Sequence, residues 1–152
     1  MFFENFRIMS HKLSGVAVVV NNRILLVHPR KFRRYDNKWS IPKGHVEHRN
    51  PLVSALKELR EETGIKLGRD YDDFVDLEYK KSGFNKKLDV YIYYLKKEDV
   101  EKFLDKGWKI KKDIYDKREI LKSQFIDLDT AYDKIEPFMY NLIDYIKSKK
   151  SL

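Results

Sequence analysis

Three glutamates lie close together near the end of one predicted helix. Glu58, Glu61 and Glu62 are spaced i, i+3 and i+4 in KELREET, so at 3.6 residues per turn they share one side. Like charges near a helix C-terminus repel one another and oppose the helix dipole, at about 0.5 kcal/mol or less per exposed pair. Such carboxylates suit Mg²⁺ or Mn²⁺. The spacing therefore indicates a divalent cation site, the alternative being a solvated acidic face offset by Lys57 and Arg60.

The helix that carries these glutamates has signals at both ends. Asn50 suits the N-cap, Pro51 suits the first helical position, and Gly64 suits the residue after a helix end. We therefore predict a helix over residues 51–63. Its buried side is formed by Leu52, Ala55, Leu56 and Leu59.

The rest of the chain alternates strand and helix signals. LSGVAVVV and RILLVH, joined by Asn21-Asn22, predict a hairpin. Further strands are predicted at DFVDLEYKK, LDVYIYYL and SQFIDL, a short helix at EDVEKFLDKG closed by Gly107, and a final helix over residues 137–149. Without repeats or linkers, this order predicts one α/β layered domain over residues 1–152.

The composition excludes several kinds of site and suggests a kind of partner. The 152 residues include no cysteine, which excludes disulfides, thiolate metal sites and cysteine nucleophiles. The apolar runs fall short of the roughly 20 residues that span a bilayer, and the first residues lack the order of a secretory signal. We expect a soluble, cytoplasmic protein. Its net charge of +8 and the basic run RKFRR at residues 30–34 favour a polyanionic partner.

Residues 44–65, GHVEHRNPLVSALKELREETGI, resemble the signature box of the Nudix hydrolases. That box is written Gly, five residues, Glu, seven residues, Arg-Glu-apolar-any-Glu-Glu-any-Gly-apolar. Its second half matches here, with Lys57 at the Arg position. The first half is one residue short and has no glutamate at the first Glu position, where Asn50-Pro51 stands instead. In the family that Glu and the Arg tie the loop to the helix, so we expect this chain to differ in the loop at residues 44–50.

The resemblance implies a Nudix-type α/β/α sandwich with a mixed central sheet. It also implies hydrolysis of a nucleoside diphosphate linked to another group, with Mg²⁺ or Mn²⁺. Metals neutralise the diphosphate and acidify a bound water, and a base accepts the water proton. We expect Glu61 and Glu62 as metal ligands, Glu58 as ligand or base, the Gly44 carbonyl as a further ligand, and Glu119 as an additional ligand or base. The expected catalytic residues are Glu58, Glu61 and Glu119.

Several residues are candidates for contacting the substrate. Arginine and lysine bind phosphate, and an aromatic face stacks on adenine. WSIPKGHVE resembles the entry to the box in asymmetric diadenosine tetraphosphate hydrolases, which predicts a dinucleoside polyphosphate. The alternatives are an RNA 5′ end, ADP-ribose, or a non-catalytic Nudix domain that binds a nucleotide or RNA. The substrate-binding candidates are Lys43, Arg30, Arg34, His45, Glu47 and Tyr91.

Overall fold

Strands of one mixed sheet run through the centre of the computed structural model, which describes residues 12–29, 38–81, 83–111 and 120–150. The sheet has six strands in the order β4-β5-β1-β2-β6, with β3 also paired to β1. The strands are β1 (Lys12–Val20), β2 (Arg23–Pro29), β3 (Lys43–His45), β4 (Asp73–Lys81), β5 (Phe84–Leu95) and β6 (Ile120–Asp127). The helices are α2 (Pro51–Thr63), α3 (Lys97–Val100), α4 (Leu128–Lys134) and α5 (Tyr140–Lys150), with 3-10 turns η1 (Glu101–Phe103), η2 (Lys106–Trp108) and η3 (Pro137–Met139).

Strand β1 lies at the centre of the sheet and has three partners. It pairs in parallel with β5 along its whole length, from Lys12 opposite Lys87 onward. Its other edge is shared between two antiparallel strands. β3 pairs with the first half, where Ser14 lies opposite Gly44, and β2 pairs with the end. This arrangement brings the start of the box to the middle of the sheet.

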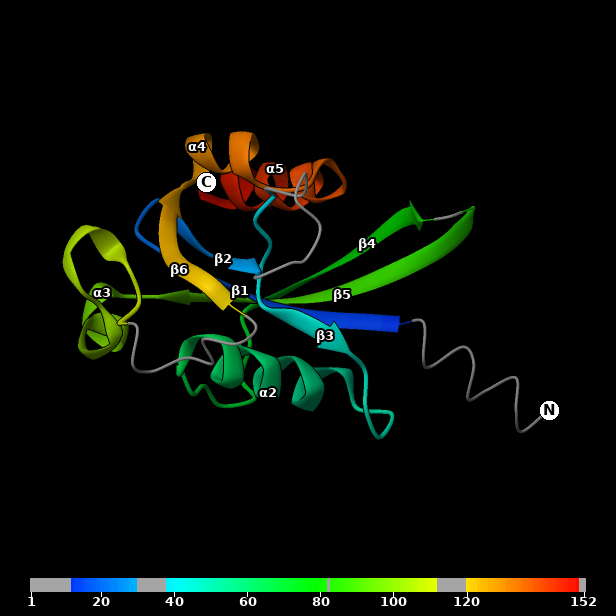
Figure 1. Ribbon diagram of the computed structural model, residues 1–152, viewed down its shortest axis with the longest axis horizontal. Helices are drawn as coiled ribbons and strands as arrows, with labels where there is room; N and C mark the ends of the chain where they lie inside the picture. The colour runs from blue at the N-terminus through cyan, green and yellow to red at the C-terminus, as the bar shows by residue number, and fades with distance from the viewer. Residues whose placement is uncertain (1–11, 30–37, 82, 112–119, 151–152) are drawn as a thin grey trace.

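Helices cover both faces of the sheet (Figure 1): α2 lies below it, and α4 and α5 lie above it. Alternate residues of β1 belong to the two cores. Val16 and Val18 pack in the cluster that includes Leu59 of α2, whereas Ala17 and Val19 pack in the cluster that includes residues of α4 and α5. Because both faces of β1 are buried, its sequence is a continuous apolar run. The predicted α/β/α sandwich is confirmed. No helix in the described part of the chain is long and apolar enough to cross a membrane.

The prediction of one helix over EDVEKFLDKG is wrong. Helix α3 ends at Val100, and after the turn η1 the backbone becomes extended at Leu104, with φ −103° and ψ 139°. Leu104 there forms a bridge with Ile110, and both side chains pack against the core on the α2 side. Gly107, with φ 72°, lies inside η2 instead of closing a helix. Packing of two apolar residues against the sheet thus overrides the local helix preference.

The final helix has a different start from the predicted one. Residues 137–139 form the 3-10 turn η3, and the α-helix α5 begins at Tyr140. The apolar side of this segment packs against the sheet, because Leu142 and Ile146 are fully buried and Phe138 and Tyr145 pack against the same cluster. Helix α4, which precedes η3, was not predicted as a separate element.

Candidate active site

Helix α2 begins and ends at the residues predicted to bound it. Asn50 Oδ1 accepts a hydrogen bond from the Val53 N–H at 3.0 Å, and Pro51 occupies the first turn. Gly64 ends the helix with a left-handed φ of 81°, and its N–H donates to the Arg60 carbonyl at 2.8 Å. Local hydrogen bonds thus set both ends of α2. Burial of its apolar side sets which way the glutamates face.

The three helix glutamates lie on one side of α2 but differ in burial. Glu62 is 7% exposed, and its backbone carbonyl accepts a hydrogen bond from Ser123 Oγ of β6 at 3.3 Å. Glu58 is half-buried and Glu61 is exposed. A buried carboxylate is stable only with charged or hydrogen-bonding partners. A divalent cation on this side of the helix would add to those partners at Glu62 and Glu58.

Gly44 lies directly against the side chain of Glu58. A Cβ atom on Gly44 would lie 2.5 Å from both Cδ and Oε1 of Glu58, so only a glycine leaves room for this carboxylate. The contact places a backbone strand and a half-buried carboxylate side by side. Carbonyl and carboxylate oxygens are the donors that hard divalent cations take. The residues present therefore fit the divalent cation predicted from the sequence.

The side chains that the structure describes do not form a complete metal site by themselves. In residues 12–29, 38–81, 83–111 and 120–150, no three His, Asp or Glu side chains converge closely enough to hold one ion. The Gly44 carbonyl is a backbone group, and Glu119 lies outside the described residues. Arg30 and Arg34, predicted to bind phosphate, also lie outside them. These four groups remain predictions for the site.

Two predicted substrate contacts from β3 face away from Glu58. Side chains alternate along a strand, so Lys43 and His45 point to the opposite face of the sheet from the one where Gly44 meets Glu58. The contact of Lys43 agrees with this, because its Cβ lies 3.0 Å from the position of a Cβ on Gly15, the residue opposite it on β1. The structure thus brings Gly44 and Glu58 together, but not Lys43 or His45 with them.

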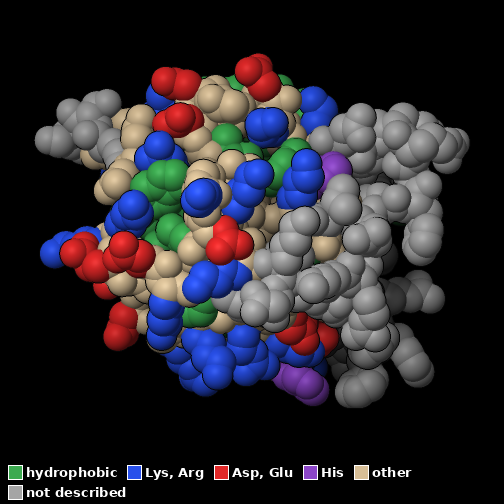
Figure 2. All heavy atoms as spheres, turned by 60° about the vertical axis from the view of Figure 1, so that its left-hand side comes forward, with side chains coloured by type: hydrophobic (Ala, Val, Ile, Leu, Met, Phe, Trp, Pro, Cys, Tyr) green, Lys and Arg blue, Asp and Glu red, His purple; other side chains and the backbone are tan. Residues whose placement is uncertain are grey.

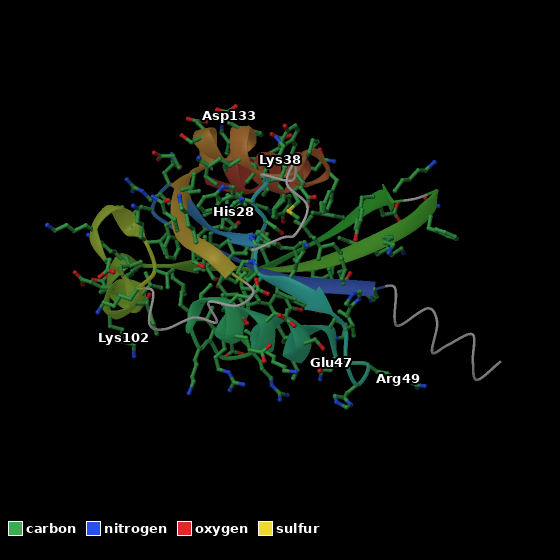
Figure 3. The ribbon with its side chains drawn as sticks, viewed as in Figure 1. His28, Lys38, Glu47, Arg49, Lys102 and Asp133 are labelled. Carbon is green, nitrogen blue, oxygen red and sulfur yellow. The ribbon has the colours of Figure 1, made fainter. Side chains whose placement is uncertain are left out.

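Glu47 lies beside the start of α2 (Figure 3), where its carboxylate pairs with a helix lysine. Glu47 Oε2 and Lys57 Nζ are 3.1 Å apart, and both side chains are about half exposed, at 50% and 43%. The hydrogen bond and charge of Glu47, followed by the charge of Glu61, raise the pKa of Lys57. Lys57 is the residue at the Arg position of the box, so this pair joins the loop to the helix.

A polar row crosses the sheet beside Gly44, and it was not predicted from the sequence. Ser14 lies between Gly44 on β3 and Asp89 on β5. Asp89 is buried, and its Oδ2 lies 2.9 Å from Lys12 Nζ. Ser14 is fully buried, and its Oγ has no hydrogen-bond partner among the described residues. Asp89 and Tyr91 lie on the same face of β5, and Asp89 is the only acidic residue of that strand, which was the available signal in the sequence.

An aromatic cluster adjoins that polar row. Tyr91 is 8% exposed, and its ring centroid lies 4.9 Å from that of Tyr71 and 5.2 Å from that of Phe74. Burial, followed by the charge of Asp89, raises the pKa of Tyr91. Tyr71 and Phe74 are 43% and 40% exposed. Tyr91 and Tyr93 pack in the cluster on the α2 side of the sheet, whereas Tyr94 packs against the cluster on the other side.

Comparison with known proteins decides the family. A model of the NUDIX domain matches residues 10–146. This chain belongs to the Nudix hydrolase family. Its predicted family is therefore confirmed. Putative hydrolase 111R of Invertebrate iridescent virus 3 is 39% identical over 56 residues, which are 36% of this chain and 30% of that protein. The chain thus matches less than a third of that relative's length.

Solved Nudix structures show the same fold at low sequence identity. A C. elegans Ap4A hydrolase complex has a TM-score of 0.67 at 18% identity, covering 92% of this chain and 97% of that one. A bifunctional NMN adenylyltransferase/ADP ribose pyrophosphatase from Francisella tularensis, complexed with AMP and Mn, has a TM-score of 0.68 at 17% identity. The match covers 92% of this chain and 42% of that one. The NUDIX domain of Shewanella oneidensis NrtR, complexed with ADP ribose, has a TM-score of 0.64 at 12% identity. The match covers 90% of this chain and 86% of that one.

Proposed function

We propose that this Nudix protein is a metal-dependent pyrophosphohydrolase. It would cleave the diphosphate linkage of a nucleoside diphosphate joined to another group. The observation that carries the proposal is the contact between Gly44 and the Glu58 carboxylate, with Glu62 buried one turn further along α2. In a Nudix box, this side of the helix is where the resemblance expects the cation.

We assign roles to the chain's own residues from the Nudix box and from the side of α2 on which the helix glutamates lie. Glu58, Glu62 and the Gly44 carbonyl would hold Mg²⁺ or Mn²⁺, with Glu61 entering from the exposed side of the helix. The bound cation supplies charge neutralisation at the diphosphate and acidifies a water. Glu58 or Glu119 accepts the proton of the attacking water, since a carboxylate near the reacting oxygen can act as the base. Lys12, anchored on Asp89 at 2.9 Å, supplies a positive charge on the same face of the sheet.

For the substrate we propose a dinucleoside polyphosphate such as diadenosine tetraphosphate. The resemblance of WSIPKGHVE to the box entry of diadenosine tetraphosphate hydrolases supports this choice. So does the cluster of Tyr71, Phe74 and Tyr91, because two of these rings are exposed and aromatic faces stack on nucleobases. The similarity in fold to an Ap4A hydrolase agrees with it.

Basic residues on α2 support an anionic substrate and keep an alternative open. Figure 2 shows Lys and Arg side chains gathered along the lower edge of the molecule, the height at which α2 lies in Figure 1. Arg60, Lys66 and Arg69 are exposed residues on and just after this helix. This surface would also suit an RNA 5′ end, whose binding would weaken steeply with salt. ADP-ribose is the second alternative, since two similar folds are an ADP ribose pyrophosphatase and a complex with ADP ribose.

A panel of substrates separates these possibilities. The purified full chain is incubated with Mg²⁺ or Mn²⁺ and, in turn, diadenosine tetraphosphate, ADP-ribose, a nucleoside triphosphate and triphosphorylated RNA, and the products are resolved by chromatography. ATP plus AMP from the first substrate is the expected result. Preferential release of phosphate or pyrophosphate from RNA would instead identify an RNA 5′ end as the substrate. Binding without turnover of any substrate, with either metal, would instead indicate a non-catalytic nucleotide- or RNA-binding domain.

A further inference from the structure

We propose that Glu47 ties the shortened box loop to α2 and so positions Gly44 against Glu58. It would take over the part that the first box glutamate plays in the family, a residue that this chain lacks. Glu47 is thus inferred to be a positioning residue, because its carboxylate lies on Lys57 and not at the Gly44–Glu58 contact. Its effect on turnover rests on the proposed function, whereas its effect on the loop does not.

Glu47 is attached to α2 by both its backbone and its side chain. Its N–H donates to Ser54 Oγ at 2.7 Å, and Ser54 Oγ donates to the Glu47 carbonyl at 3.2 Å. Ser54 is 5% exposed, so the loop backbone is fixed to a buried point on the helix. The carboxylate adds the 3.1 Å contact with Lys57, one turn further along α2.

The short loop explains why the tie comes from Glu47. The Asn50 N–H donates to the Glu47 carbonyl at 3.1 Å, which closes a tight turn between them. The two residues inside this turn, His48 and Arg49, have φ values of 53° and 59°. Non-glycine residues adopt this left-handed conformation at a cost of about 1 kcal/mol or more each. The chain therefore passes from Glu47 to the N-cap with no residue to spare for a second loop acid.

The tie connects the two segments that meet at the candidate metal site. Glu47 is three residues after Gly44, and Lys57 directly precedes Glu58. On the other side of the loop, the Val46 N–H donates to the Lys12 carbonyl at 3.0 Å. An exposed ion pair adds little to global stability. A small displacement of reacting groups, however, can lower a rate by about 10²-fold. Loss of the tie should therefore affect turnover far more than unfolding.

The first experiment compares Glu47→Gln with Glu78→Gln. Glu78 is a matched control, because it is also an exposed glutamate paired with a lysine, with 3.9 Å between its Oε1 and Lys87 Nζ on the β4–β5 hairpin. In Glu47→Gln we expect kcat for diadenosine tetraphosphate to fall about tenfold with KM changed less than about twofold, since the effect is on geometry. Glu78→Gln should match the parent. Lys57→Arg, which keeps the charge and gives the family's own residue, should retain most of the activity.

A second readout uses the metal-free protein and needs no turnover. Hydrogen–deuterium exchange should become faster for the amides of residues 44–50 in Glu47→Gln, and stay unchanged in Glu78→Gln. If the panel of substrates gives no activity but exchange increases in this way, the tie stands and the proposed function fails. Unchanged exchange in Glu47→Gln overturns the role given to the carboxylate, whatever the activity, because only the backbone bonds to Ser54 would then hold the loop.

A loop of family length provides the decisive test. Replacing His48-Arg49 by Gly-Gly-Glu restores the missing position and places a glutamate seventh in the box. If Glu47 serves in place of that residue, Glu47→Gln should lower kcat less than about twofold in this background, against about tenfold in the parent. Equal losses in both backgrounds would show that Glu47 does something else, and the proposal would be overturned. Circular dichroism and the unfolding midpoint confirm that each variant is folded.

Discussion

Neighbouring glutamates at the end of α2 have different surroundings. Glu62 is 7% exposed and lies against β6, whereas Glu61 is exposed to solvent. The buried side chain is restricted by its neighbours, whereas the exposed one faces solvent. A cation bound on this side of α2 would depend more strongly on the group whose position is fixed.

We therefore expect Glu62→Gln to lower kcat by at least about 10²-fold and to weaken Mn²⁺ binding, because the isosteric amide removes only the charge that the cation needs. Glu61→Gln should also lower kcat, by a smaller factor. The measurements are steady-state kinetics and Mn²⁺ titration followed by electron paramagnetic resonance, with circular dichroism to check the fold. Unchanged turnover in Glu62→Gln would place the site elsewhere.

Gly44 allows a test that separates activity from stability. In Gly44→Ala the new Cβ would meet Glu58 Cδ and Oε1 at 2.5 Å, so the flexible carboxylate must move while the backbone stays. We expect kcat to fall by about 10²-fold with little change in the urea midpoint.

Two other glycines serve as controls for Gly44→Ala. A Cβ on Gly15 would lie 2.7 Å from the backbone oxygen of Pro42, so Gly15→Ala should destabilise the fold by about 1–3 kcal/mol. A Cβ on Gly68 meets nothing within 4 Å, and Gly68→Ala should behave as the parent. A Gly44→Ala protein with full activity would contradict the role given to the Gly44–Glu58 contact.

At the scale of elements, α2 is the part whose boundaries are set by its own residues. Asn50→Ala removes the 3.0 Å cap bond to the Val53 N–H, and we expect a loss of about 1 kcal/mol in the free energy of unfolding. Urea denaturation measures this value. Asn50→Ser, which can make the same bond, should restore most of it. An alanine variant as stable as the parent would mean that the helix start is held by the loop contacts of Glu47 alone.

The elements that sequence predicts best are those defined by local chemistry. The caps of α2 and the β1–β2 hairpin with its Asn-Asn turn were predicted from spacing and turn residues and are confirmed. The structure of residues 98–107 was predicted wrongly, because it depends on the bridge between Leu104 and Ile110, which local helix preference does not reveal. The Lys57–Glu47 pair was missed for the same reason, since it depends on the path of the loop between them.

At the scale of the whole molecule, the order of the strands in the sheet could not be predicted from residue spacing and secondary-structure propensity. The parallel pairing of β1 with β5 joins segments about 75 residues apart, and the Gly44–Ser14–Asp89 row exists only once that pairing forms. The α/β/α layering was predicted by family resemblance and is confirmed by the comparisons. Roles for individual site residues remain predictions, because they depend on distances of a few ångströms and on residues outside the described ranges.

Stability should fall at high pH because of Tyr93, which is buried, and Tyr94, which is partly buried. Burial raises the pKa of Tyr93 to about 12 and that of Tyr94 to about 12. In the unfolded chain these hydroxyls titrate near pH 10, so between about pH 10 and 12 only the unfolded state loses the protons. Their contribution is therefore complete below about pH 10 and is lost as the pH rises through about 12.

Urea midpoints across this range, with tyrosinate absorbance recorded in parallel, measure the effect. The double variant Tyr93→Phe/Tyr94→Phe should show a shallower decline than the parent, and identical slopes would contradict the assignment. Tyr94→Phe alone should cost little at neutral pH, because the buried Tyr94 hydroxyl has no hydrogen-bond partner among the described residues.

The central place of β1 also fixes an order of events during synthesis. β1 and β2 leave the ribosome first and can form their hairpin at once, but the parallel partner β5 follows about 75 residues later. At about 5–20 residues per second, the edge of β1 that pairs with β5 stays unpaired for several seconds. An unpaired apolar edge readily joins another chain. Slower translation between β2 and β5 should therefore increase aggregation of the nascent protein, and chaperones that bind extended apolar segments should reduce it.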